Sequence, residues 1–229
     1  MNPTNILSDH DHPQVQSLAS QLTSIKTNPM DQLEAIFLFV RDEIKFGFPP
    51  KWDQVKASET LGYQLGYCNS KAILFHALCK AVGIPSRIHT GLIDITIMRG
   101  IFPGFVFPFL PDSGGHSWIE VQFDGDWQPI DSYINDQPFY ENAKRFLHES
   151  GKLTSYSISE AKGSSSCEFN LGDKGFVHMG AVLEDHGTWD DFSEYITSDK
   201  YIAMSAMQLM AYPIMTRLSN RRIAKIRSF

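Results

Sequence analysis

The sequence predicts a chain in which helices pack against an antiparallel sheet. Apolar residues recur at helical spacing in residues 31–45 and 68–82, and two strand-like runs flank an Asp-Gly pair at residues 124–125. The chain has 229 residues, of which 42 % are apolar and 20 % are charged. This composition excludes a disordered or collagen-like chain, and the length allows one domain with a sizeable core or a domain with an extension.

The charge is distributed unevenly along the chain. There are 20 Lys and Arg against 26 Asp and Glu, a net charge of −6, which argues against a dedicated nucleic-acid binder because such proteins need clustered cations. An acidic body is joined to a basic end, since the chain after residue 216 carries five cations and no acid: Arg217, Arg221, Arg222, Lys225 and Arg227. We expect this end to pack on the core. Contact with an anionic membrane or a nucleic acid is the alternative.

Neither a disulfide framework nor a metal site is predicted. The irregular spacing of the three cysteines favours free thiols in a reducing compartment: Cys68, Cys79 and Cys167. His10 and His12 have no later partner at ligand spacing, so we expect them in a solvated terminus. Residues 1–13 do not read as a secretory signal, and the apolar stretch at residues 202–215 is too short to span a membrane. The sequence predicts a cytoplasmic protein that needs no cofactor.

The first predicted helix covers residues 31–45. Its apolar residues fall on one helical face: Leu33, Ile36, Phe37, Val40 and Ile44. Asp31 is a suitable N-cap, and the Pro-Pro pair at residues 49–50 cannot continue the helix. A short second helix is expected to open at Ser58 and to be closed by glycines at positions 62 and 66.

Residues 68–82 form the strongest helix prediction, and Gly83 and Pro85 end it. Residues 86–97 are β-branched and extended in character. The loop at residues 101–111 alternates Phe with Pro and is too rich in proline for a central strand. This loop either forms a wall of an apolar acyl pocket or packs against the C-terminal part, and the sequence leaves both open.

Two strands joined by a two-residue turn are predicted at residues 116–123 and 127–134. This register places Trp118 opposite Asp131. His116 and Asp131 are then diagonal neighbours on one face, with Cβ atoms roughly 7–8 Å apart, which allows a hydrogen bond between them. A slip of one residue would move Asp131 to the other face.

Cys68, His116 and Asp131 together form a complete set for nucleophilic catalysis. Cys68 begins a helix, where the dipole favours thiolate and is expected to lower the thiol pKa, while free N–H groups there can bind an oxyanion. An aspartate that accepts from one imidazole nitrogen leaves the other nitrogen to take the thiol proton. The structural alternative is that each of the three residues only makes local hydrogen bonds.

Five blocks of sequence then resemble the transglutaminase-like superfamily in order and approximate spacing: ASETL at residues 57–61, GYCNSKA at 66–72, GIPSR at 83–87, GHSWIEV at 115–121 and WQPID at 127–131. The resemblance implies a papain-like α+β fold, with helices packed on an antiparallel sheet, that transfers acyl groups through a thioester. It also implies that Cys68 is the nucleophile, His116 the base and Asp131 the group that orients the base.

The resemblance divides the chain into three parts. We expect an N-terminal segment at residues 1–30, a transglutaminase-like catalytic core at residues 31–137 and a C-terminal extension at residues 138–229 that packs on the core. The extension is predicted to be largely helical, with helices at residues 139–149 and 201–225.

One position departs from the pattern of papain-like enzymes. They commonly carry a glutamine six residues before the cysteine, where this chain has Gly62. Gln64 is the nearby candidate for an oxyanion hole, and Tyr67 and Trp118 are candidates for substrate contact. The sequence shows no acidic run of the kind that binds calcium, so the calcium dependence of animal transglutaminases is not expected.

The sequence therefore predicts a cysteine-dependent acyl-transfer enzyme. The expected substrates are peptides, proteins or small amides and thioesters, and hydrolysis by a peptidase or amidase is the leading reaction. Transfer to an amine, as in a transglutaminase, amide synthase or cyclase, is the alternative. A non-catalytic binding module on the same fold and a metalloprotein that uses Cys68 are the rivals from other classes. The oligomeric state stays open.

Overall fold

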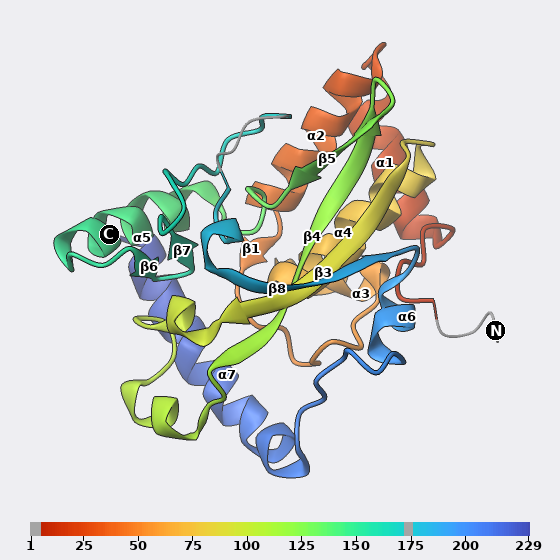
Figure 1. The fold of residues 1–229 in the computed structure, drawn as a ribbon. Helices are drawn as coiled ribbons and strands as arrows, with labels where there is room; N and C mark the ends of the chain where they lie inside the picture. Colours follow the sequence, from red (N-terminus) through yellow and green to blue (C-terminus); the bar gives the residue numbers. More distant parts are fainter. Residues whose placement is uncertain (1–5, 172–175) are drawn as a thin grey trace.

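A four-stranded antiparallel sheet with the strand order β5-β4-β3-β8 forms the centre of the fold (Figure 1). The computed structural model describes residues 6–171 and 176–229. The four strands are β3 (Ser86–Asp94), β4 (Ser113–Phe123), β5 (Asp126–Ile130) and β8 (Val182–Trp189). The sequence did not predict β8, which lies far along the chain from β3 and pairs with it antiparallel.

Helices from the first third of the chain cover the sheet. They are α1 (Pro13–Thr23), α2 (Pro29–Asp42), α3 (Ala57–Tyr63) and α4 (Cys68–Ala81). The central member is α4, which contacts β3, β4 and the other three helices. Its residues 69–79 are all buried, so the predicted helix is confirmed and forms the middle of the core.

The predicted boundaries of these helices need three corrections. Asn28, not Asp31, caps α2, because its side chain accepts from the Asp31 N–H at 2.8 Å. Gln64 closes α3 in a left-handed conformation (φ 50°), where two glycines were expected. The third correction concerns α1, which was not predicted and which buries Val15 and Ala19 against the core.

The predicted hairpin register is confirmed. Phe123 pairs with Asp126, and Ile119 pairs with Ile130 at the far end of the ladder. Both turn residues have positive φ, 50° at Asp124 and 90° at Gly125, as a tight two-residue turn requires. Because β5 ends at Ile130, it pairs with β4 only as far as Ile119. The part of β4 that carries His116 therefore lies beyond the end of β5.

The remaining chain forms helices and short strands around the sheet. These are β1 (Lys45–Phe46), β2 (Leu65–Gly66), α5 (Gln137–Glu149), β6 (Thr154–Ser155), β7 (Ile158–Ser159), α6 (Phe192–Ile196) and α7 (Ala206–Arg227). Of these, α5, β6 and β7 lie at one end of the sheet and α6 lies at the other (Figure 1). Short 3-10 turns lie at Ile95–Met98, Gly104–Phe109 and Met179–Ala181. Among the described residues, no helix is long and apolar enough to cross a membrane.

Hydrogen bonds from α7 tie it to the segment after α2. The Asn220 side chain accepts from the Phe48 N–H and donates to the Phe48 carbonyl, both at 2.9 Å. Arg227 donates to both carboxylate oxygens of Asp136 at 2.7 Å and to the Phe46 carbonyl at 2.8 Å. The basic end thus places one of its five cations in an internal ion pair.

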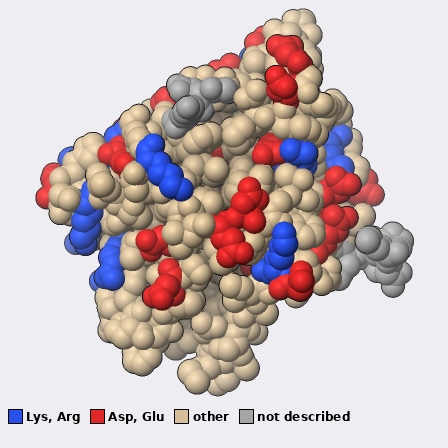
Figure 2. Space-filling view, in the orientation of Figure 1, with Lys and Arg blue, Asp and Glu red and all other residues tan. Residues whose placement is uncertain are grey.

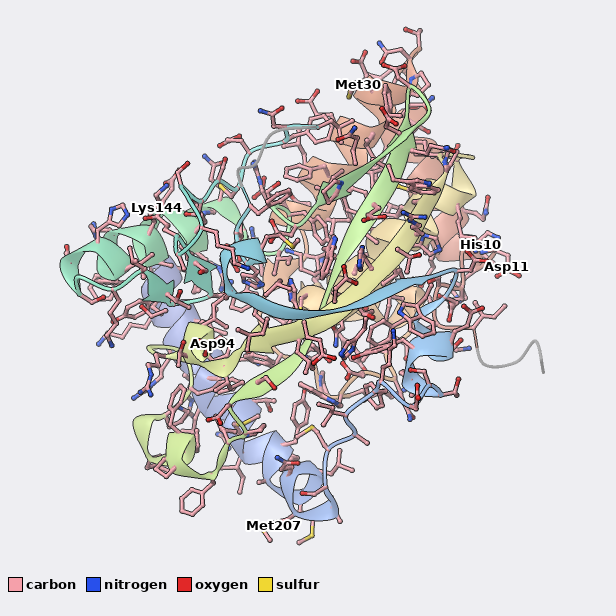
Figure 3. The ribbon with its side chains drawn as sticks, in the orientation of Figure 1. His10, Asp11, Met30, Asp94, Lys144 and Met207 are labelled. Atoms are coloured by element: carbon pink, nitrogen blue, oxygen red, sulfur yellow. The ribbon has the colours of Figure 1, made fainter. Side chains whose placement is uncertain are left out.

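The loop at residues 101–111 divides into a buried and an exposed part. Ile101 and Phe102 are buried, and the Phe102 carbonyl accepts from Arg222 of α7. Phe105 and Phe109 are 69 % and 83 % exposed. This loop and residues 201–216 contain no charged residue, and the lower end of the molecule in Figure 2 is correspondingly free of charge. Met207, labelled in Figure 3, projects from α7 at this end.

Candidate active site

Cys68 is the first residue of α4. The extended backbone of Tyr67 precedes it, and the Ser70 hydroxyl accepts from the Tyr67 N–H at 3.0 Å, which fixes the start of the helix. Gly66 permits the close approach of the preceding strand β2. A Cβ atom there would lie 2.8 Å from Lys71 Cγ and 2.9 Å from Ser70 Oγ. The sequence Gly-Tyr-Cys therefore places a partly exposed thiol at a tightly packed helix start.

The first turn of α4 is bound to β4 beside His116. The Ser117 hydroxyl donates to Asn69 Oδ1 at 2.9 Å, and the Cys68 thiol donates to the same oxygen at 3.4 Å. The Ser117 N–H also lies close enough to donate to the Cys68 sulfur. This N–H is on the part of β4 that extends beyond β5. The nucleophile candidate thus contacts the residue next to the base candidate.

The Cys68 thiol is neutral in this structure. Burial raises its pKa to about 12, although the N–H groups of Ser117, Asn69 and Cys68 favour the thiolate. The predicted lowering of the pKa by the helix start is therefore wrong for this state. The physical reason is that removing a thiolate from water costs more free energy than the hydrogen bonds from these N–H groups recover.

His116 lies on β4 opposite Gly91 of β3 and is 1 % exposed. Its ring is 5.8 Å from the Trp118 ring and 5.1 Å from the His178 ring, measured between centroids. Within residues 6–171 and 176–229, neither ring nitrogen has a hydrogen-bond partner. Burial, together with His178, lowers the His116 pKa well below its usual value of 6.5, so the ring is neutral.

Asp131 follows β5 directly and is buried. Its carboxylate accepts from three consecutive backbone N–H groups, those of Val177 at 2.8 Å, His178 at 2.7 Å and Met179 at 3.0 Å. The expected hydrogen bond to His116 is not formed among the described residues, because the 177–179 turn takes up the carboxylate oxygens. Burial raises the Asp131 pKa to about 7 against the effect of these three donors.

The three candidates for substrate contact are placed differently. Gln64 is exposed at the end of α3, and its participation in an oxyanion hole stays a prediction. Tyr67 and Trp118 are buried, at 4 % and 3 % exposure. The Tyr67 ring stacks on Trp52 at 5.1 Å, and the Trp118 ring stacks on His89 at 4.2 Å. In this conformation both rings are packed inside the protein and do not line an open surface.

Asp53 is a site residue that the sequence analysis missed. It is buried in the loop before α3 and accepts from Asn69 Nδ2 at 2.7 Å, from Tyr201 Oη at 2.8 Å and from Tyr67 Oη. It therefore joins the first turn of α4 to the C-terminal part of the chain. A single aspartate in a loop without periodicity gives no signal in the sequence.

His178 is the second missed residue. Its Nε2 atom lies 2.9 Å from the Ser157 carbonyl oxygen and 2.7 Å from Ser157 Oγ. Ser157 has a left-handed backbone (φ 61°), and its hydroxyl donates to Asn135 Oδ1 at 3.0 Å. No group of three or more His, Cys, Asp or Glu side chains in the described part of the chain is arranged to hold a metal ion.

The sequence model of the transglutaminase-like superfamily matches residues 16–132, just over half of the chain. The chain belongs to the transglutaminase-like superfamily. The predicted family and the transglutaminase-like α+β fold are thereby confirmed, and membership supports a cysteine-dependent enzyme in general terms. The matched range contains Cys68, His116 and Asp131 and ends well before His178.

Solved structures that resemble this transglutaminase-like chain include a "Putative Cysteine Protease" from Cytophaga hutchinsonii, with a TM-score of 0.49 and 18 % sequence identity. The similarity covers 82 % of this chain and 45 % of that chain, so this chain spans less than half the length of its structural neighbour. No curated protein matches the sequence.

Proposed function

We propose that this protein is a thiol hydrolase that cleaves amide or thioester bonds through an acyl-enzyme on Cys68. The observation that carries the proposal is that the Cys68 thiol, at the start of α4, and the hydroxyl of Ser117, the neighbour of buried His116 on β4, both donate to Asn69 Oδ1. Nucleophilic catalysis needs a thiol and an imidazole held on rigid elements, and here the thiol candidate begins a helix while the imidazole candidate belongs to the strand bonded to that helix.

The protonation states define how the reaction would begin. Because both the thiol and the imidazole are neutral, His116 takes the Cys68 proton while the sulfur attacks the carbonyl carbon. The N–H groups at the start of α4 supply donors for the negative oxygen that forms. The imidazolium then gives its proton to the leaving group, and the thioester remains on Cys68.

Hydrolysis completes the proposed cycle. His116 takes a proton from a water molecule that attacks the thioester carbon, and it returns this proton to the Cys68 sulfur as the acid leaves. An amine acceptor would follow the same route, with the amine in place of water. Asp131 stays the proposed third member of the site, and in this structure it acts on the 177–179 turn that contacts His116.

The proposed substrates are peptides, proteins or small acyl compounds. A cytoplasmic location is part of the same proposal. It is supported by three cysteines that are all free thiols, as expected in a reducing compartment.

The test uses p-nitrophenyl acetate as an acyl donor and follows both p-nitrophenol release and the mass of the intact protein. We expect a burst of p-nitrophenol and one acetyl group on Cys68, both absent in Cys68→Ala. Cys167→Ala is the matched control, because it removes a thiol from the C-terminal part and should keep the burst. Equal esterase rates in wild type and Cys68→Ala, without an adduct, would instead indicate a binding module.

A second arm of this experiment addresses the acceptor. Glycinamide is added at increasing concentration, and the products are separated by mass. Acetate as the main product supports hydrolysis. Acetylglycinamide as the main product at low amine concentration would show that the enzyme is an amine-accepting acyltransferase.

A further inference from the structure

Three buried ring nitrogens without hydrogen-bond partners belong to two neighbouring imidazole rings. They are Nδ1 and Nε2 of His116 and Nδ1 of His178, all without a hydrogen-bond partner in the described parts of the chain. The two ring centroids are 5.1 Å apart. A buried polar atom without a partner costs about 1–3 kcal/mol, so three of them in one place call for a functional explanation.

The hydrogen bonds of His178 define which of its nitrogens carries the proton. Its Nε2 atom faces the Ser157 carbonyl oxygen at 2.9 Å, and a carbonyl oxygen can only accept. The Nε2 atom is therefore the donor. Burial lowers the His178 pKa to about 3, so the ring carries no second proton at neutral pH. The Nδ1 atom is consequently a free acceptor inside the protein.

His116 needs such an acceptor. A neutral imidazole has one N–H donor, and when it acts as a base its second nitrogen also becomes a donor. The sequence predicted that Asp131 would accept this N–H, but the Asp131 oxygens bind the backbone of residues 177–179. The same three hydrogen bonds hold the main chain of His178 so that its ring lies against His116.

We infer that His178 orients His116 through its free Nδ1 atom, in a Cys68–His116–His178 relay in which Asp131 fixes the backbone of His178. In this relay one His116 nitrogen takes the thiol proton, and the N–H of the other nitrogen donates to His178 Nδ1. The proton on Nε2 of His178 does not move, and His116 later passes the acquired proton to the leaving group. His178 is thus a positioning residue, and the inference rests on the proposed function.

The position of His178 supports this assignment in a second way. It lies outside residues 16–132, the range that matches the superfamily model. Its ring is held by Ser157, which is held in turn by Asn135: Asn135 Nδ2 donates to the Ser157 carbonyl at 2.7 Å. Three residues from outside the matched range, Asn135, Ser157 and His178, are therefore hydrogen-bonded in series, and the last of them contacts the His116 ring.

Two substitutions at position 178 separate orientation from packing. His178→Asn places an amide oxygen close to the position of Nδ1 and so keeps the acceptor. His178→Gln places an amide N–H close to the position of Nε2, which keeps the hydrogen bond to Ser157 and removes the acceptor. Thermal unfolding of both variants checks that the fold is retained. A purely structural role would favour His178→Gln, because only that variant keeps the bond to Ser157.

The readouts are the rate of Cys68 alkylation by iodoacetamide at pH 8 and the burst rate with p-nitrophenyl acetate. We expect His178→Gln to lower both rates by roughly 10- to 100-fold and His178→Asn to restore them to within a few-fold of wild type. Equal rates in wild type and His178→Gln would overturn the inference. Absence of an acetyl adduct in wild type would overturn the proposed function alone, because alkylation still reports on His178.

Discussion

Residues 29–136 and residues 137–229 contribute to the site in different ways. The first region supplies the thiol of Cys68 and the imidazole of His116 on a regular helix and a regular strand. The second region supplies side chains that reach into the first from loops and helix ends: His178, Tyr201 and Arg227. The proposed reacting groups and the groups that support them therefore come from different parts of the chain.

The range that matches the family model contains only part of the candidate site. The match to residues 16–132 covers the proposed nucleophile and base, but it contains none of the three supporting side chains. Each supporting side chain binds a buried acid or contacts a buried base of the first region: Tyr201 binds Asp53, Arg227 binds Asp136, and His178 lies against His116. A fragment that ends at residue 132 would lack all three of these supporting side chains.

The largest expected effect compares one thiol from each region. Burial raises the pKa of both Cys68 and Cys167 to about 12, but only Cys68 is partly exposed. Below the pKa, the thiolate fraction grows about tenfold with each pH unit. In a His116→Ala variant, which lacks the proposed base, we therefore expect the alkylation rate of Cys68 to rise about tenfold per pH unit, or roughly a thousandfold from pH 7 to pH 10. Peptide mapping after iodoacetamide treatment measures this rate.

Cys167 serves as the internal control in that measurement, and it should stay unmodified while the protein is folded. A Cys68 rate that levels off below pH 8 would contradict the raised pKa. It would show that the thiolate of Cys68 is already populated near neutral pH.

The next effect concerns the ion pair between the two regions. Arg227→Ala leaves the Asp136 carboxylate, whose side chain is fully buried, without its cation. We expect the free energy of unfolding to fall by about 3 kcal/mol, measured by denaturant titration. Arg221→Ala, at an exposed position of the same helix, is the control and should change it by less than about 0.5 kcal/mol. Equal losses of unfolding free energy in the two variants would mean that the overall positive charge of α7 stabilises the fold and that the Arg227–Asp136 ion pair does not.

The smallest effect concerns the hydrogen bond from Tyr201 to Asp53. Tyr201→Phe removes one of three donors to this buried carboxylate, and Tyr67 and Asn69 remain. We expect a loss of about 1–2 kcal/mol in the free energy of unfolding, because the charged acceptor loses part of its solvation. Tyr63→Phe, on the exposed side of α3, should have no measurable effect. A Tyr201→Phe variant as stable as wild type would show that the hydrogen bond from Tyr201 to Asp53 does not stabilise the fold.

The features that the sequence predicted correctly depend on local patterns. The helix at residues 68–82 and the register of the 124–125 hairpin follow from spacing and turn chemistry within short windows. The helix α1 escaped notice because only Val15 and Ala19 of its residues are buried, and β8 because only one of its eight residues, His186, is buried. Neither leaves a clear apolar period in the sequence.

The site was predicted less completely, for a physical reason. The thiol pKa depends on how much water the assembled neighbours exclude from Cys68, and no local pattern reports this. The partners of Asp131 are backbone N–H groups 46 to 48 residues away, which any residue except proline could supply. The resemblance to a family located the candidate reacting residues, and only the structure revealed their surroundings.

The link between Asp136 and Arg227 has a consequence for biosynthesis. The two residues are 91 positions apart. A ribosome that adds about 5–20 residues per second needs roughly 5–18 s to cover that interval. During this time the nascent chain holds an acid destined for the interior without the cation that neutralises it. The segment around Asp136 can therefore complete its packing only after Arg227 has been synthesised. A chain that is released before residue 227 lacks this ion pair.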